Sequence, residues 1–145
     1  MSAPIFVDTN LLVYVRDAAG PEKQQRAAGW MRYLWQERLG RVSTQVLNEY
    51  YVTVTQKLTP GLSREAARED VRQLFAWDPI VPDVVILDAA FAVQDRFGFS
   101  WWDSLIVSAA QASGCDTLLS EDMQDGQDLS GVLVVNPFGT APPRT

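Results

Sequence analysis

Three short apolar runs, each bounded by polar or turn-forming residues, constrain the fold of this 145-residue chain more than any other feature. They lie at residues 4–8, 116–120 and 132–135, and longer segments rich in helix-forming residues separate them. Strands that are apolar on both faces are typical of a parallel sheet, whose connections are helical crossovers. The pattern therefore predicts an α/β fold in which helices cover both faces of a short parallel sheet.

Residues that start and end helices divide the rest of the chain. Pro21 suits a first turn, Ser63 suits an N-cap, and Gly40 is expected to end the second helix. The sequence 100–103 is similar to a capping box and is expected to start the last helix. Helices are expected at 10–17, 21–39, 45–58, 64–77, 84–98 and 104–113, and two weaker strands at 41–43 and 80–81.

Composition favours one globular domain over residues 1–145, with a core at about 4–138 and a loose tail at 139–145. Hydrophobic residues make up 47% of the chain and charged residues 21%, which is typical of a packed protein. No apolar run approaches the roughly 18 residues of a membrane span, and no signal peptide is apparent. The single cysteine, Cys115, suits a reducing compartment. We therefore expect a cytoplasmic protein with no membrane partner.

The chain contains no histidine and carries a formal net charge of −6. The lack of histidine excludes Ser-His-Asp and Cys-His catalysis and histidine-rich zinc sites. The negative charge argues against a simple nucleic-acid-binding module, unless converging acids hold metal cations. Any acid–base or metal chemistry must therefore use carboxylates.

Four acidic residues occur where such a sheet would bring them together. Asp8 ends the first strand, and Asp122 follows the strand at 116–120. Asp103 lies in the first turn of the preceding helix, and Glu49 lies in the helix after the second strand. Ligands bind at the carboxyl ends of the strands in such sheets. Because two carboxylates about 4 Å apart repel by roughly 4 kcal/mol at an effective dielectric constant of about 20, a cluster requires a cation. Oxygen ligands suit Mg²⁺ or Mn²⁺, and phosphoester hydrolysis is the natural chemistry.

Each acid also has an ordinary structural interpretation. Asp8 could be an N-cap, Asp103 a member of a capping box, and Glu49 a solvated helix residue. Asp122 and Asp125 could be surface residues of an acidic loop. The order and spacing of the acids, rather than any one of them, favour a metal site. If Asp8 is a metal ligand, Thr9 or Asn10 is expected to cap the first helix in its place.

Four segments resemble the acidic motifs of the PIN-domain ribonucleases, and above all of the VapC-type toxins of type II toxin–antitoxin systems. The segments read VDTNLLVY, QVLNEYY, WWDSLIVSAA and LLSEDMQDGQ, and the resemblance covers residues 5 to about 138. It implies a PIN-like three-layer α/β/α sandwich with a parallel sheet in the order 3-2-1-4-5. It also implies a metal-dependent, single-strand-specific endoribonuclease, in which water activated by Mg²⁺ or Mn²⁺ attacks an RNA phosphodiester.

The resemblance also implies the roles of individual residues. Asp8, Glu49 and Asp103 match the first three catalytic and metal-binding acids of the family. Asp122 is favoured as the fourth, with Asp125 as an additional or outer ligand. Small polar residues expected to support these acids are Thr9, Asn10, Ser104 and Ser120. The family further implies a VapB-type antitoxin that blocks the site, and a homodimer.

Aromatic and basic residues near the motifs allow more than one interpretation. Trp101 and Trp102 precede Asp103, where packing is the default role and stacking on an RNA base the alternative. Aromatic residues on the expected helix at 21–39, and at the end of the expected helix at 64–77, could lie in the core or at an interface. Arginines that could contact phosphates are Arg16, Arg26, Arg32 and Arg38.

Three alternative functions remain open. The chain could be a PIN-fold nuclease outside a toxin–antitoxin pair, acting in RNA processing or on DNA, or a catalytically inactive PIN interaction module. A phosphotransfer domain of the receiver or haloacid-dehalogenase type is the weakest alternative. The dehalogenase type needs an Asp where Asn10 stands, and both types need a Lys near a later strand, whereas the only lysines are Lys23 and Lys57.

Overall fold

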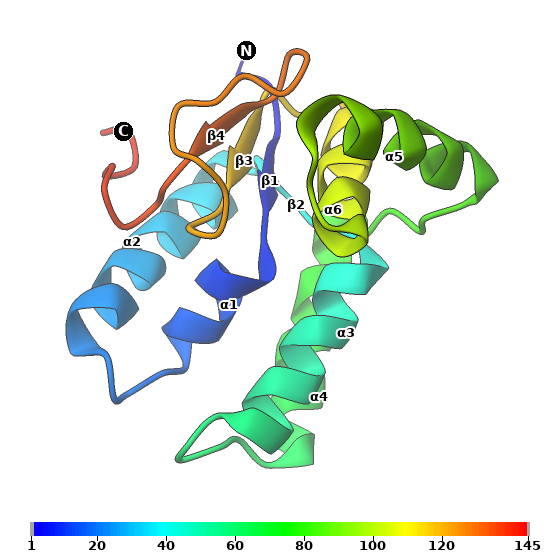
Figure 1. Ribbon diagram of the computed structural model, residues 1–145. Helices are drawn as coiled ribbons and strands as arrows, with labels where there is room; N and C mark the ends of the chain where they lie inside the picture. The colour runs from blue at the N-terminus through cyan, green and yellow to red at the C-terminus, as the bar shows by residue number, and fades with distance from the viewer. Residues whose placement is uncertain (1, 145) are drawn as a thin grey trace.

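A parallel four-stranded sheet forms the centre of the computed structural model, which describes residues 2–144 (Figure 1). Its strands lie in the spatial order β2-β1-β3-β4. They are β1 (Ile5–Val7), β2 (Gly40–Arg41), β3 (Thr117–Leu119) and β4 (Leu133–Val135). Phe6 pairs with Arg41 on one side and with Leu118 on the other, so β1 is a central strand. All three of its residues are buried, as the apolar run predicts.

Within the described residues the sheet has four strands where five were expected. Ile80 forms only an isolated parallel bridge with Ser43, and its N–H donates to the carbonyl of Val42 over 3.1 Å. Pro79 and Pro82 flank this bridge and provide no N–H groups, so the pairing cannot extend into a ladder. The bridge lies beyond β2. The expected order 3-2-1-4-5 is therefore confirmed, with its third strand reduced to one residue pair.

Residues 2–144 form six α-helices, and the last turns of two expected helices take other forms. A π-helical turn, η1 (Thr53–Lys57), follows α3 (Thr44–Val52) and ends at Lys57. A 3₁₀ turn, η2 (Phe75–Trp77), follows α4 (Arg64–Leu74) and ends at Trp77. In η1 the carbonyl of Val54 accepts from the N–H of Leu62, outside the helix. The helices are α1 (Thr9–Val15), α2 (Pro21–Glu37), α3 (Thr44–Val52), α4 (Arg64–Leu74), α5 (Val84–Phe97) and α6 (Trp101–Ala112).

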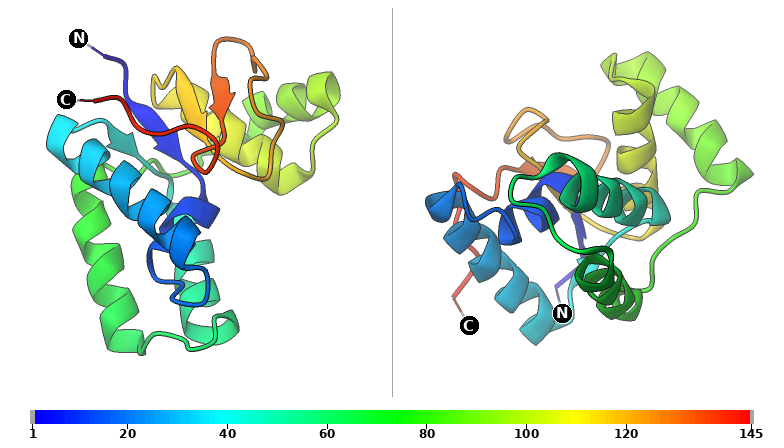
Figure 2. Two further views of the ribbon diagram at one scale, coloured as in Figure 1. Left: turned by 90° about the vertical axis from the view of Figure 1, so that its left-hand side faces the viewer. Right: turned by 90° about the horizontal axis from the view of Figure 1, so that it is seen from below.

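The helices flank the sheet and extend beyond one of its ends. α1 and α2 lie to one side of the strands and α5 and α6 to the other (Figure 1). α3 and α4 run side by side and project past the carboxyl ends of the strands (Figure 2). The predicted α/β fold with a flanked parallel sheet is thereby confirmed. No helix in residues 2–144 is both long and apolar enough to span a membrane.

Gly40 does not end α2, contrary to the expectation from sequence. Arg38 is the C-cap, in the left-handed region at φ 58°, and its N–H donates to the carbonyl of Leu34. Gly40 instead begins β2, where a Cβ atom would lie 2.5 Å from Cε2 of Trp77. The glycine is therefore required by the close approach of the buried Trp77 ring, a contact between residues far apart in the sequence.

The aromatic residues of α2 and η2 divide between core and surface. Trp30 is buried, and its indole N–H donates to the carbonyls of Pro137 and Thr140, which anchors the segment after β4. Trp35 packs on Trp77 but keeps 40% of its surface exposed. The core interpretation therefore holds for Trp30, while Trp35 is available on the surface.

Candidate active site

Asp8 lies at the junction of β1 and α1 and serves both elements. Its N–H donates to the carbonyl of Leu119 in β3 over 3.0 Å, which continues the sheet. Its Oδ1 accepts from the N–H of Thr9 at 2.8 Å, so Asp8 is the N-cap of α1. Its Oδ2 accepts from Oγ of Ser120 at 2.7 Å. The expectation that Thr9 or Asn10 caps the helix is wrong, because the residue leaving the strand already has the extended backbone of an N-cap.

Ser120 and Asn10 connect Asp8 to Asp122. Nδ2 of Asn10 lies 3.2 Å from Oδ2 of Asp122, 3.4 Å from Oγ of Ser120 and 3.5 Å from Oδ2 of Asp8. The N–H of Asp122 donates to Oγ of Ser120 at 3.2 Å. Two acids that are far apart in the sequence are thus joined through an amide and a hydroxyl at the carboxyl edge of the sheet.

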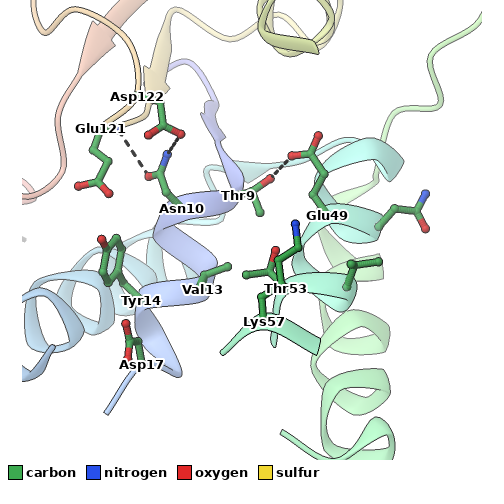
Figure 3. A pocket seen from close by; sticks show the side chains of 12 residues that line it. Thr9, Asn10, Val13, Tyr14, Asp17, Glu49, Thr53, Lys57, Glu121 and Asp122 are labelled. Carbon is green, nitrogen blue, oxygen red and sulfur yellow. Dashed lines mark hydrogen bonds between the residues drawn. The ribbon is translucent and has the colours of Figure 1, made fainter. Parts of the chain in front are cut away.

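Glu49 reaches the same edge from α3 (Figure 3). The hydroxyl of Thr9 donates to Oε2 of Glu49 at 2.8 Å, and Nε2 of Gln45 donates to Oε1 at 2.9 Å. Because Thr9 follows Asp8 directly, the hydroxyl links the second acid to the first. The two hydrogen bonds fix both oxygens of the Glu49 carboxylate.

Asp103 lies in the first turn of α6, and its N–H donates to the capping hydroxyl of Ser100 at 3.1 Å. Burial raises the pKa of Asp103, and the charges of Asp122 and Glu49 raise it further, while a hydrogen bond with Ser100 opposes them. Ser104 donates to the carbonyl of Ser100 at 2.8 Å and so supports the start of the helix, not an acid. The third acid therefore shares its electrostatic environment with the second and fourth.

Burial raises the pKa of Asp8 to about 7. The hydrogen bonds from Ser120 and Thr9 lower it, and the charges of Asp122 and Asp103 raise it again. A carboxyl group that is 5% exposed beside other acids is costly to ionise without a positive charge nearby. The site thus favours any cation that can bind Asp8 in its ionised form.

The donor set fits a hard divalent cation by its chemistry. Carboxylate oxygens are the ligands that Mg²⁺ and Mn²⁺ prefer. As they stand, the side chains of residues 2–144 present no group of three acids arranged to hold one ion. The amide of Asn10 lies within 3.5 Å of both Asp8 and Asp122, where a positively charged group would be most stabilised.

A cavity of about 660 Å³ opens beside these acids, between α1 on one side and α3 with η1 on the other. Lys57 is the only cation among the twelve described residues that line it, and its side chain extends toward the end where Glu49 lies (Figure 3). Glu121, also in the wall, accepts from Nζ of Lys23 at 2.7 Å. The cavity thus combines the acids with one unpaired lysine in its wall, among the described residues.

Two other residues considered from the sequence have different partners. Oδ1 of Asp125 accepts from the N–H of Asn136 at 2.8 Å, which joins the acidic loop to the end of β4. Arg16 donates twice to Asp70, at 2.6 and 2.8 Å, so its guanidinium is already paired. Burial raises the pKa of Asp70, and hydrogen bonds from Arg16 and Tyr50 lower it by more, so it lies below its ordinary value.

Sequence reasoning missed Lys57 and Gln45 as members of this region. The signal was present, because positions 45, 49, 53 and 57 follow one another at intervals of four and share one helix face. This spacing places Gln45 and Lys57 on the same side of the helix as Glu49.

A family model describing the PIN domain matches residues 5–124. The chain belongs to the PIN domain family. The family membership expected from the four motifs is thereby confirmed, and the matched range includes Asp8, Glu49, Asp103 and Asp122. A comparison with curated protein sequences found no significant relative of this PIN domain.

Comparison with solved structures places this PIN domain beside the crystal structure of VapC20 from Mycobacterium tuberculosis, described as a sarcin-ricin loop cleaving toxin. The TM-score is 0.58 at 17% sequence identity, over 81% of this chain and 91% of that one. At this identity the likeness shows the shared fold.

Proposed function

We propose that this PIN domain is a metal-dependent endoribonuclease that hydrolyses phosphodiester bonds in single-stranded RNA. The observation that carries the proposal is the linkage of Asp8 to Asp122 through Ser120 and Asn10, with Glu49 attached through Thr9. Asp103 belongs to the same set through its electrostatic coupling to Asp122 and Glu49. Four acids at the carboxyl edge of a parallel sheet, with no histidine in the chain, support metal-assisted hydrolysis.

In this proposal Asp8, Asp103, Asp122 and Glu49 hold Mg²⁺ or Mn²⁺. The bound cation supplies a water of lowered pKa and neutralises charge on the phosphate. Ser120 and the N–H of Thr9 orient the Asp8 carboxylate, and the Thr9 hydroxyl orients Glu49. Asp125 is not one of these ligands in the proposal, because its carboxylate accepts from the N–H of Asn136 and stabilises the acidic loop.

The cavity of about 660 Å³ beside the acids, called the first cavity below, contains residues that assist RNA binding and the metal site. Lys57 attracts a phosphate of the strand and partly offsets the repulsion between RNA and an acidic protein. Asn10 orients Asp8 and Asp122 toward one another through its amide, which also contacts Ser120.

We further propose that the protein is the toxin of a toxin–antitoxin pair. The fold shared with VapC20 supports this role. In this proposal the toxin acts on RNA in the cytoplasm, forms a homodimer and is blocked by a VapB-type antitoxin. A nuclease of RNA processing or of DNA, and an inactive interaction module, are the alternatives. A small antitoxin gene directly upstream would favour the toxin, whereas a gene standing alone would favour a processing nuclease.

The test uses the purified chain, free of any partner, with single-stranded RNA, duplex RNA and single-stranded DNA of the same sequence. Cleavage of single-stranded RNA is expected with Mg²⁺ or Mn²⁺ and is expected to stop on chelation. Asp8→Asn is expected to abolish it. Cleavage that persists after chelation or in Asp8→Asn would overturn the four-acid mechanism, and cleavage of the DNA strand alone would favour the DNA nuclease.

A further inference from the structure

A second cavity, of about 590 Å³, lies on the other side of Glu49. Asn48 and Glu49 line both cavities, so the two spaces adjoin at Glu49. The wall of the second cavity is much less charged than that of the first, since its described residues include one charged side chain against five in the first. The lining residues are Thr44, Gln45, Asn48, Glu49, Val81, Pro82, Trp102 and Leu105.

Trp102 is the most unusual residue of this wall. It lies next to Asp103 in the first turn of α6, and 63% of its surface is exposed. Its neighbour Trp101, in contrast, stacks on Phe91 with ring centroids 5.1 Å apart. Among residues 2–144 no aromatic ring packs on the Trp102 indole, which lies one residue from a proposed metal ligand and is available to a flat ligand.

Gln45 supplies the polar edge of the same cavity. Its Nε2 donates to Oε1 of Glu49 at 2.9 Å and to the carbonyl of Trp102 at 3.3 Å, so it ties the indole's helix to the acid. Its Oε1 is buried and has no hydrogen-bond partner among the described residues. This oxygen lies beneath the surface of the wall, so Gln45 shapes the cavity through the two hydrogen bonds of its Nε2.

We propose that this second cavity binds one unpaired nucleobase of the RNA strand beside the scissile phosphate, an inference that rests on the proposed ribonuclease function. The Trp102 indole stacks on the base, and the exposed amide of Asn48 faces its polar edge. A base must leave its stack to enter, which gives a physical reason for a preference for single strands.

The charge distribution favours a base over other occupants. Glu49 is the only charged residue among the described residues of this wall, so the cavity repels phosphate and accepts a neutral ring. A phosphate of the RNA strand is instead attracted to the ammonium group of Lys57 in the first cavity. The volume falls in the range of roughly 300 to 1,000 Å³ that is usual for sites binding small ligands.

The test measures RNA affinity in the Asp8→Asn background, where cleavage does not interfere. Fluorescein-labelled single-stranded RNA that the wild type cleaves is titrated and followed by anisotropy. Trp102→Ala is expected to weaken binding roughly 5- to 150-fold, and Trp102→Phe to retain most of it. Trp35→Ala removes an exposed indole from α2 and is expected to leave affinity unchanged.

Abasic substitutions in the RNA identify the base. Removing the base at one position beside the mapped cleavage site is expected to weaken RNA binding by the Asp8→Asn protein. The same abasic RNA is expected to bind the protein that also carries Trp102→Ala as well as intact RNA does, because loss of the base and loss of the indole remove the same interaction. Equal losses in both proteins, or unchanged affinity in Trp102→Ala, would overturn the base site. So would dissociation of a dimer by Trp102→Ala in light scattering, which would make this face an interface between copies. If the wild type cleaves no RNA, the proposed function itself fails.

Discussion

The hydroxyl of Ser120 donates a 2.7 Å hydrogen bond to Oδ2 of Asp8, across 112 positions of sequence. Both residues are buried, and they end neighbouring strands, β3 and β1. The hydrogen bond fixes the rotation of the carboxylate and lowers its pKa against the effect of burial. The strand pairing itself thus sets the geometry of the proposed first ligand.

Ser120→Ala is expected to lower cleavage or metal affinity about 10- to 100-fold, since it removes the hydrogen bond that orients Asp8. Titration with Mn²⁺, followed by thermal shift and by cleavage rate, measures both. Ser113→Ala is the matched control, because its hydroxyl donates only to the carbonyl of Ala109 at the end of α6. Equal effects of the two changes would contradict the role of Ser120.

Asp8→Asn is expected to stabilise the metal-free protein at pH values above about 7. Folding raises the pKa of Asp8 from an ordinary 3.8 to about 7, so the unfolded chain releases this proton first. The wild type therefore loses stability as the pH rises between these values, by at most about 4 kcal/mol. Thermal unfolding in chelator across this range is expected to show the slope in the wild type and its reduction in the variant. Mn²⁺ is expected to stabilise only the wild type.

Asp122→Asn and Asp125→Asn are expected to differ. Asp122 connects to Asp8 through Asn10 and Ser120, so its loss is expected to lower cleavage by more than tenfold, whereas Asp125 binds the N–H of Asn136. Asp125→Asn is expected to keep the cleavage rate within about threefold, since the amide oxygen still accepts that hydrogen bond. Steady-state rates at saturating Mn²⁺ distinguish the two, and the reverse ranking would make Asp125 the fourth acid.

Lys57→Ala is expected to weaken RNA binding without changing the metal affinity. A lysine that neutralises one phosphate of a single strand contributes about 0.7 to the slope of log affinity against log salt. Titrations in the Asp8→Asn background over a series of KCl concentrations measure this slope. Lys23→Ala is a suitable comparison, because its ammonium is already paired with Glu121.

Gly40→Ala is expected to destabilise the protein by about 1–3 kcal/mol, since the new Cβ would overlap the ring of Trp77. Gly29→Ala lies inside α2, where the nearest atom is 3.8 Å away, and is expected to stabilise by about 0.5–1 kcal/mol. Urea unfolding of both variants measures the difference. A stable Gly40→Ala would show that Trp77 can move aside.

Features decided by local chemistry were predictable from the sequence. Ser63 and Ser100 cap their helices as expected, because each side chain accepts from an N–H in the first turn. The convergence of Asp8, Glu49 and Asp122 at one edge of the sheet was also predictable, because their spacing follows the strand–helix alternation. What escaped prediction depends on contacts distant in sequence, such as Trp77 against Gly40 or Asn136 against Asp125.

The fine structure of α3 shows the same limit. Its expected span at 45–58 has the right position, but its last residues form the π-helical turn that carries Lys57 toward the cavity. The hydrogen bond from Leu62 to the carbonyl of Val54 comes from a loop whose path the sequence does not reveal. The spacing therefore predicts the helix face on which Lys57 lies, but not the π-helical turn that contains it.

The isolated bridge at Ile80 has a consequence for how copies of this protein can associate. Ile80 directs its N–H to Val42 and accepts from the N–H of Thr44, so both of its backbone groups are used inward. Pro79 and Pro82 add no donors on either side. This margin of the sheet therefore offers little template for a foreign strand, and edge-to-edge aggregation is discouraged there. Any dimer across this margin has to form through side chains, which makes it sensitive to single surface substitutions.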